Sequence, residues 1–179
     1  MARNNTRLQV QSLTVSAMLC ALGVVILALG ALIEVIDLSV GVIASLLCIF
    51  AVIELKGAYP WMIWLVTSIV GYLLLPLKTP VIFYALFFGF YPIIKEKAEK
   101  LSSPLSWVVK LITLHVSLLV ILLTLWLFFP ELLSGMGQLL FLVGMYVASL
   151  VVFVLYDVAL TRIITFYFIR LRHRFRFKQ

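Results

Sequence analysis

The stretch LTVSAMLCALGVVILALGALI at residues 13–33 carries no charged side chain and is long enough to cross a bilayer, which takes roughly 20 apolar residues. Hydrophobic residues make up 65% of the 179-residue chain and charged residues 12%. A soluble domain of this composition would expose large apolar patches. Five more apolar stretches follow the first, at about residues 38–55, 60–75, 80–94, 105–129 and 133–160. The sequence therefore predicts an all-α, polytopic membrane protein, a single integral membrane domain with six transmembrane helices.

The basic residues predict how these helices are oriented. With six spans, 13 of the 14 lysine and arginine residues lie on one side of the membrane, and Lys78 lies on the other. The positive-inside rule then places both termini in the cytoplasm, with residues 161–179 as a basic tail, in a multi-pass protein of the cell membrane. A cleaved signal peptide is the alternative for the first stretch. Its apolar run, however, exceeds the usual core of about 7–15 residues, and its removal would leave an odd number of spans.

The fourth stretch is the shortest and contains a proline, Pro92. About 15 residues of α-helix span roughly 23 Å, which is less than the hydrocarbon thickness of about 30 Å. Because proline removes a helical hydrogen bond, we expect this helix to kink or to end early near Lys95. Two i,i+4 pairs, Lys95 with Glu99 and Glu96 with Lys100, are expected to carry its end into water as a solvated turn.

Several polar residues lie within the apolar stretches. Cys20 and Cys48 are interpreted as small packing residues, because their spacing does not suit metal ligands. His115 is expected to link two helices, since an imidazole in lipid is costly without a hydrogen bond. Asp157 is expected to pair with a basic side chain at the cytoplasmic rim.

The sequence does not favour an enzyme or a nucleic-acid-binding protein. It contains no His-Glu-x-x-His metal motif, no nucleophile elbow and no Gly-rich phosphate loop, so we expect no catalytic residues, no metal and no cofactor. The net charge of +7 is compatible with nucleic-acid binding. The basic residues near the carboxyl terminus, however, follow a helix rich in aromatic residues, which suits anionic lipid headgroups better. These basic residues are Arg170, Arg172, Arg174 and Arg176.

Charged and aromatic side chains gather near the expected outer rim, where a pocket could bind a small molecule. Glu34 and Asp37 rank highest, because two carboxylates in so short a connection repel each other unless a cation or a donor lies between them. An acidic majority at this rim favours a cationic or zwitterionic ligand. Each residue could instead belong to a solvated loop end or to the aromatic belt of the membrane interface. The candidate ligand-binding residues are Glu34, Asp37, Tyr72, Lys78, Tyr84, Trp126 and Gln138, with Glu131 at the same rim.

The first helix carries small residues that would let another helix approach closely, among them Ser16, Ala17, Ala21 and Gly23. Taken alone, this pattern is typical of packing within one chain. The opening LTVSAMLCALG at residues 13–23, in a short six-helix chain, nevertheless resembles the substrate-binding S components of energy-coupling factor transporters. In that family an Ala-x-x-x-Ala pair in the first helix docks on a shared transmembrane subunit, which two cytoplasmic ATPases drive. Ala17 and Ala21 match that pair.

Three further segments, residues 76–78, 84–95 and 156–162, resemble uncharacterised S-component-like proteins of Gram-positive bacteria. The vitamin-contact patterns of the characterised members are not among the matching residues. The resemblance therefore implies an S-component-like bundle and a solute-capture subunit, with an energy-coupling module as its partner, but no particular ligand. The alternative is a non-transporting multi-span scaffold of cell-envelope assembly, whose basic tail recruits a cytoplasmic partner.

Overall fold

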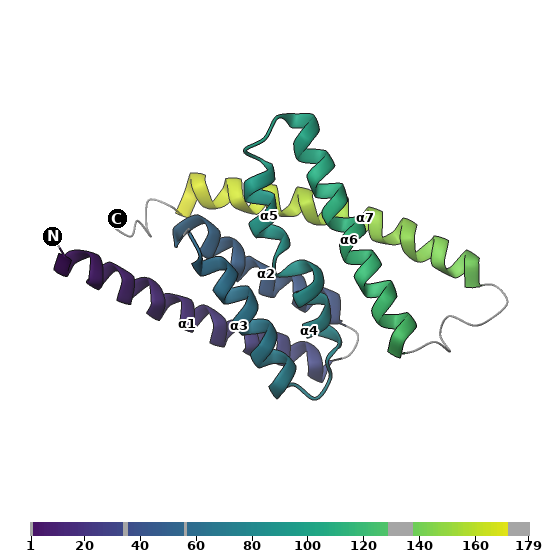
Figure 1. Ribbon diagram of the computed structural model, residues 1–179, viewed down its shortest axis with the longest axis horizontal. Coiled ribbons are helices and arrows are strands. Elements are labelled where there is room, and N and C mark those ends of the chain that lie inside the picture. Colours follow the sequence, from purple (N-terminus) through teal and green to yellow (C-terminus); the bar gives the residue numbers. More distant parts are fainter. Residues whose placement is uncertain (1, 34–35, 56, 129–137, 172–179) are drawn as a thin grey trace. The chain divides into compact units, whose positions relative to one another are not determined.

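The computed structural model describes residues 2–33, 36–55, 57–128 and 138–171, which are almost entirely helical (Figure 1). No strand occurs in these ranges, so the predicted all-α class is confirmed. The elements are α1 (Ala2–Leu32), α2 (Asp37–Glu54), α3 (Tyr59–Leu74), α4 (Thr79–Phe83), the π-helix η2 (Tyr84–Phe88), α5 (Tyr91–Ala98), α6 (Ser103–Phe128), α7 (Gln138–Phe166) and the π-helix η4 (Tyr167–Leu171).

Helices occupy all six of the predicted apolar stretches. In the described part of the chain, four of them are long and apolar enough to cross a membrane, and α3 is a shorter apolar helix. Two helices extend beyond the predicted spans. Helix α1 begins at Ala2, well before residue 13, and α7 with η4 runs to Leu171, so the first residues of the predicted basic tail, 161–171, are helical. Hydropathy detects the part of a helix that suits lipid, and both helices continue beyond that part.

The chain divides into two compact units. The amino-terminal unit runs to Lys110 and the carboxy-terminal unit begins at Leu111, within α6. The single membrane domain expected from the sequence stays a prediction.

In the amino-terminal unit, α2 is the central helix and contacts α1, α3, α4, η2 and α5. Small residues allow the helices to approach closely. A Cβ atom placed on Gly23 of α1 would lie 3.0 Å from Cγ2 of Thr67 in α3, and one placed on Gly30 would lie 3.0 Å from Cγ1 of Val40 in α2. Close backbone approach of this kind is what drives helix association in lipid, where no hydrophobic force acts between helices.

The fourth stretch is broken, as Pro92 predicted. Helix α4 passes into η2, a turn follows, and α5 begins at Tyr91 with Pro92 in its first turn, where a missing N–H costs little. The π-helical segment was not predicted. The Gly89 N–H donates to the Tyr84 carbonyl at 2.7 Å, five residues back. This shift releases the Ala85 carbonyl, which accepts a hydrogen bond from Nε1 of Trp64 at 3.1 Å.

Both predicted ion pairs after this break are present. Lys95 Nζ lies 2.9 Å from Glu99 Oε1, and Lys100 Nζ lies 2.6 Å from Glu96 Oε1. The expectation of a fully solvated turn is wrong for Lys95, whose side chain is only 1% exposed. The reason is that α5 packs against α2, and Lys95 lies on the buried face of α5.

In the carboxy-terminal unit, a hydrogen bond links α6 to α7. His115 Nδ1 lies 2.7 Å from the Leu111 carbonyl, and His115 Nε2 lies 2.8 Å from the Tyr146 hydroxyl. A carbonyl can only accept, so Nδ1 carries the hydrogen and, in the neutral imidazole, Nε2 accepts from Tyr146. The expected role of His115 as a link between helices is confirmed.

Candidate ligand site in the amino-terminal unit

One end of the amino-terminal unit brings together the connections that the sequence assigned to the outer rim. A Cβ atom on Gly71 of α3 would contact Val81 of α4 at 3.2 Å and Leu27 of α1 at 3.8 Å, and Gly30 of α1 packs against Val40 of α2. The α1–α2 and α3–α4 connections therefore lie at the same end of this unit (Figure 1). Of the predicted ligand-binding residues, Asp37, Tyr72 and Lys78 lie at this end.

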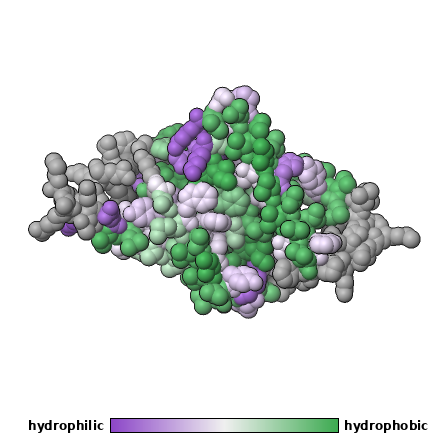
Figure 2. Space-filling model, viewed as in Figure 1, coloured by the Kyte–Doolittle hydropathy of each residue, from purple (hydrophilic) through white to green (hydrophobic). Residues whose placement is uncertain are grey.

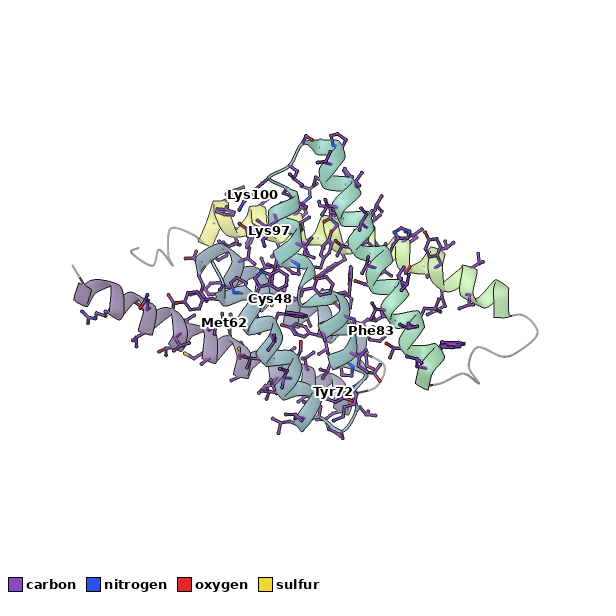
Figure 3. The ribbon with its side chains drawn as sticks, in the orientation of Figure 1. Cys48, Met62, Tyr72, Phe83, Lys97 and Lys100 are labelled. Atoms are coloured by element: carbon purple, nitrogen blue, oxygen red, sulfur yellow. The ribbon has the colours of Figure 1, made fainter. Side chains whose placement is uncertain are left out.

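Lys78 and Tyr72 are in direct contact. The Lys78 ammonium donates to the backbone carbonyls of Tyr72 and Leu75, and it lies 5.1 Å from the centre of the Tyr72 ring. The last carbonyls of a helix carry partial negative charge and have no partner within the helix, so this lysine caps α3. The Tyr72 side chain is largely exposed (Figure 3). In this geometry Lys78 caps the end of α3, and its positive charge already interacts with these two carbonyls and with the Tyr72 ring.

Asp37 is the first residue of α2 and is half-buried. A carboxylate in this place is favoured by the positive end of the helix dipole. Asp37 therefore lies at one end of the helix around which the other helices of this unit pack. Its predicted neighbour Glu34 lies outside the described residues.

The remaining candidates apart from Tyr84 belong to the carboxy-terminal unit or lie outside the described residues. Trp126 belongs to α6 in the carboxy-terminal unit and is exposed. Gln138 is the first residue of α7, and its side chain is outside the described part of the structure, as is Glu131. Three of the predicted residues thus lie at the same end of the amino-terminal unit, and the contribution of the others stays a prediction.

Tyr84 lies deeper than the sequence suggested. Its side chain is 1% exposed, and its hydroxyl lies 3.2 Å from Sγ of Cys48. Tyr84 belongs to η2 and Cys48 to α2, so this contact joins the broken helix to the central helix. Figure 3 shows Cys48 in the middle of this unit. The placement at the outer rim is therefore corrected: Tyr84 is a core residue below the Asp37 end.

Two more uncharged polar side chains lie beside this pair. Thr67 of α3 is fully buried and lies close to both Tyr84 and Cys20. Cys20 of α1 contributes its thiol, which lies 3.9 Å from the Ile63 carbonyl. We call Cys20, Cys48, Thr67 and Tyr84 the polar core cluster. It draws one residue from each of α1, α2, α3 and η2.

The hydroxyl of Thr67 is the least satisfied member of the polar core cluster. Within the described residues, Oγ1 of Thr67 has no partner in hydrogen-bond geometry, although Cys20 and Tyr84 are near. A threonine inside a helix usually donates to the carbonyl four residues before it, which here is that of Ile63. That carbonyl is approached by the Cys20 thiol instead. The cluster can thus offer a hydroxyl to a neutral polar group.

The sequence did not predict the polar core cluster. It predicts packing roles for Cys20 and Cys48 and no role for Thr67, because the cluster forms only when residues from different helices come together. One available signal was that uncharged polar residues stand inside three neighbouring apolar stretches. Over the described ranges, no group of three or more His, Cys, Asp or Glu side chains could hold a metal ion, so the cluster offers hydrogen bonds and no metal site.

Helix α1 divides its small residues between two faces. Ser16 and Gly23 are buried, and so is Gly30, which is one further seven-residue step along the same face. Ala17 and Ala21, the pair assigned to partner docking, are exposed. The packing of this unit therefore uses one row of small residues and leaves the other uncovered.

Comparison of the chain with models of known protein families, with curated proteins and with solved structures finds no match. The resemblance to the S components stays a prediction from the sequence.

Proposed function

We propose that this chain is a membrane-embedded solute-capture subunit, similar to the S component of an energy-coupling factor transporter. It would bind a small molecule from the outer face and dock a transmembrane partner through α1. The observation that carries this proposal is the division of small residues on α1. The row needed for packing within the chain is buried, and the Ala17–Ala21 row is exposed.

The exposed row suits a helix partner. Alanine side chains let a second backbone come close, and van der Waals packing then stabilises the pair in lipid. Met18 and Leu22 flank the row and are also exposed, at 68% and 49%. They form the neighbouring row of the helix and provide apolar contact on one side of the close approach. Larger side chains at Ala17 and Ala21 would hold the partner away while leaving the buried row untouched.

The other half of the proposal, a ligand site, is supported by the end of the unit that holds Asp37. A half-buried carboxylate lies at the start of the central helix, and the polar core cluster lies about three turns further along that helix, next to a broken helix. Broken helices near the middle of a membrane protein commonly border binding sites, because irregular backbone is tolerated only where protein or a cavity shelters it. A site of this kind would accept a small cationic or zwitterionic molecule with a neutral polar portion.

The docking half of the proposal is tested by co-purification from native membranes. We expect an energy-coupling module to be recovered with the wild-type chain and lost from the Ala17→Leu/Ala21→Leu variant. A matched control is Ala148→Leu/Ala159→Leu, which changes two exposed alanines of α7 in the same way. Melting temperatures in detergent should be equal for all three proteins. Recovery of the module with the Ala17/Ala21 variant, or equal loss from both variants, would refute docking through α1.

The capture half is tested by thermal-shift screening of amines, nucleobases and vitamins on the purified chain. We expect a compound that raises the melting temperature of the wild type and raises that of Asp37→Asn much less. If no compound stabilises the protein and no coupling module is recovered, the proposal fails and the scaffold alternative is favoured.

A further inference from the structure

The end of the amino-terminal unit that is remote from Asp37 carries four lysines on or next to α5, and they differ in their surroundings. Lys95 and Lys110 are buried, and both approach Oε1 of Glu99, at 2.9 and 3.5 Å. Their positive charges are balanced within the protein by the Glu99 carboxylate. Lys100 is exposed but forms an ion pair with Glu96 at 2.6 Å.

Lys97 is different from these three. Its side chain is exposed, and within the described ranges it forms no ion pair with a carboxylate. Its ammonium lies instead over Trp61 of α3, 5.4 Å from the ring centre. A cation over an indole face keeps its charge available on the other side, because the ring does not neutralise it.

Trp61 is held in place by its neighbours. Its ring meets Trp64 edge to face, with 5.7 Å between centres, and Trp64 in turn meets Phe90 at 5.9 Å. Trp64 is itself fixed by its hydrogen bond to the Ala85 carbonyl. The Lys97 ammonium is thus positioned by a chain of aromatic contacts that begins at the broken helix.

The surface beside this pair is apolar. Met62 and Leu65 of α3, immediately after Trp61, are each 48% exposed. Figure 3 shows Met62 and Lys97 on neighbouring parts of the unit, and Figure 2 shows a hydrophilic patch over α5 beside hydrophobic surface. A tryptophan and a lysine directly above exposed apolar side chains mark the level at which lipid tails give way to headgroups.

We propose that Lys97 and Trp61 form a binding site for the phosphate of an anionic phospholipid. The ammonium would meet the phosphate oxygens, Trp61 would lie at the glycerol level, and Met62 and Leu65 would contact the upper part of an acyl chain. A lipid fits better than an acidic protein segment, because a single available cation borders the exposed apolar side chains of Met62 and Leu65, which an acyl chain matches and an acidic segment does not. The site is independent of α1 docking and of the Asp37 end.

The test measures phosphatidylglycerol and phosphatidylcholine bound to the full chain in neutral detergent, by native mass spectrometry with lipid titration. We expect the wild type to prefer phosphatidylglycerol. Lys97→Gln should weaken phosphatidylglycerol binding about fivefold, the effect of one basic residue near a membrane surface. Lys97→Arg should retain it. Lys100→Gln is the matched control, because it removes the same charge three residues further along the chain, from a lysine that is already paired with Glu96.

Equal binding by wild type and Lys97→Gln would overturn the site. An equal loss in Lys97→Gln and Lys100→Gln would also overturn it, since that result indicates diffuse surface charge. Displacement of phosphatidylglycerol by millimolar inorganic phosphate would assign the site to the free anion, and displacement by a polyglutamate peptide would assign it to a protein partner. Either result would contradict the lipid assignment.

Discussion

The helices of the two units of this protein are packed to different extents. In the most apolar stretch of α2, 44% of the residues are buried, against 17% in each of α6 and α7. The amino-terminal unit packs helices through glycines and through polar contacts between helices, such as Cys48 with Tyr84. In the carboxy-terminal unit, His115 and Tyr146 form a polar contact between α6 and α7. Hydroxyl groups donate to carbonyls of their own helix in both units, as those of Ser117 and Ser68 do.

This difference shows which part of the chain selects specific partners for its helices. Lipid tails solvate a leucine as well as another leucine does, so apolar side chains alone do not select a helix partner. Small residues and hydrogen bonds do. The amino-terminal unit holds both, and it also holds the residues on which the proposed functions depend. We therefore expect substitutions there to have large effects and equivalent substitutions in the carboxy-terminal unit to have small ones.

The largest contrast is expected between two glycines. A Cβ atom on Gly89 would lie 2.4 Å from Cδ1 of Trp64 and 2.9 Å from the Tyr84 carbonyl oxygen, whereas one on Gly144 of α7 would meet nothing within 4 Å. Gly89→Ala should lower the free energy of unfolding by about 2 kcal/mol. Gly144→Ala should leave it equal or slightly higher. Melting curves in one detergent compare the two variants, and equal melting temperatures would contradict the contrast.

The polar core cluster should give the next largest effect. Tyr84→Phe removes the hydroxyl that meets the Cys48 thiol, and we expect a loss of about 1 kcal/mol. In a double-mutant cycle with Cys48→Ala, the second substitution should cost less once the first is present, because both remove one contact. The readout is again thermal unfolding. Strictly additive losses would mean that the contact contributes nothing to stability.

The sequence predicted the helical class and the approximate spans because lipid leaves the backbone few choices. Every buried N–H and C=O in a bilayer must be paired, so apolar stretches of sufficient length become helices. The helix ends at Ala2 and Leu171 were not predicted, because polar residues can continue a helix beyond the lipid and hydropathy does not report them. A break in the fourth stretch was predicted from Pro92, since a missing N–H is a local property of the chain; the break itself lies just before Pro92, between η2 and α5.

The site was only partly predictable. Charge alone placed Lys78 and Asp37 at one end, but it could not distinguish a ligand-binding lysine from one that caps α3 through the Tyr72 and Leu75 carbonyls. The π-helix is accompanied by a tertiary contact, the hydrogen bond that the indole of Trp64 in α3 donates to the Ala85 carbonyl. The polar core cluster likewise arises from tertiary packing. Contacts of this kind have no signature in a window of neighbouring residues.

A smaller effect is expected for the link between α6 and α7. Tyr146→Phe removes the hydroxyl that donates a hydrogen bond to Nε2 of His115 at 2.8 Å. Hydrogen bonds between membrane helices contribute about 0.6 kcal/mol on average, because the separated helices find other partners. We expect a loss of that order, and His115→Leu should cost no more, since it removes the polar group as well. A loss above that of Tyr84→Phe would show that the carboxy-terminal unit depends on hydrogen bonds more than the amino-terminal unit does.

The smallest effect on stability is expected at Thr67, and it is the most informative about function. Its side chain is fully buried, and its hydroxyl has no partner in hydrogen-bond geometry within the described residues. Thr67→Val keeps the shape and removes that hydroxyl, so the free energy of unfolding should stay equal or rise only slightly. The control Thr67→Ala leaves a gap against Gly23 and should be about 1 kcal/mol less stable. A stable Thr67→Val protein that no longer responds to a stabilising compound would place the hydroxyl in the ligand site. A destabilised one would show that Cys20 or Tyr84 already satisfies the hydroxyl, and the polar core cluster would then be a packing element.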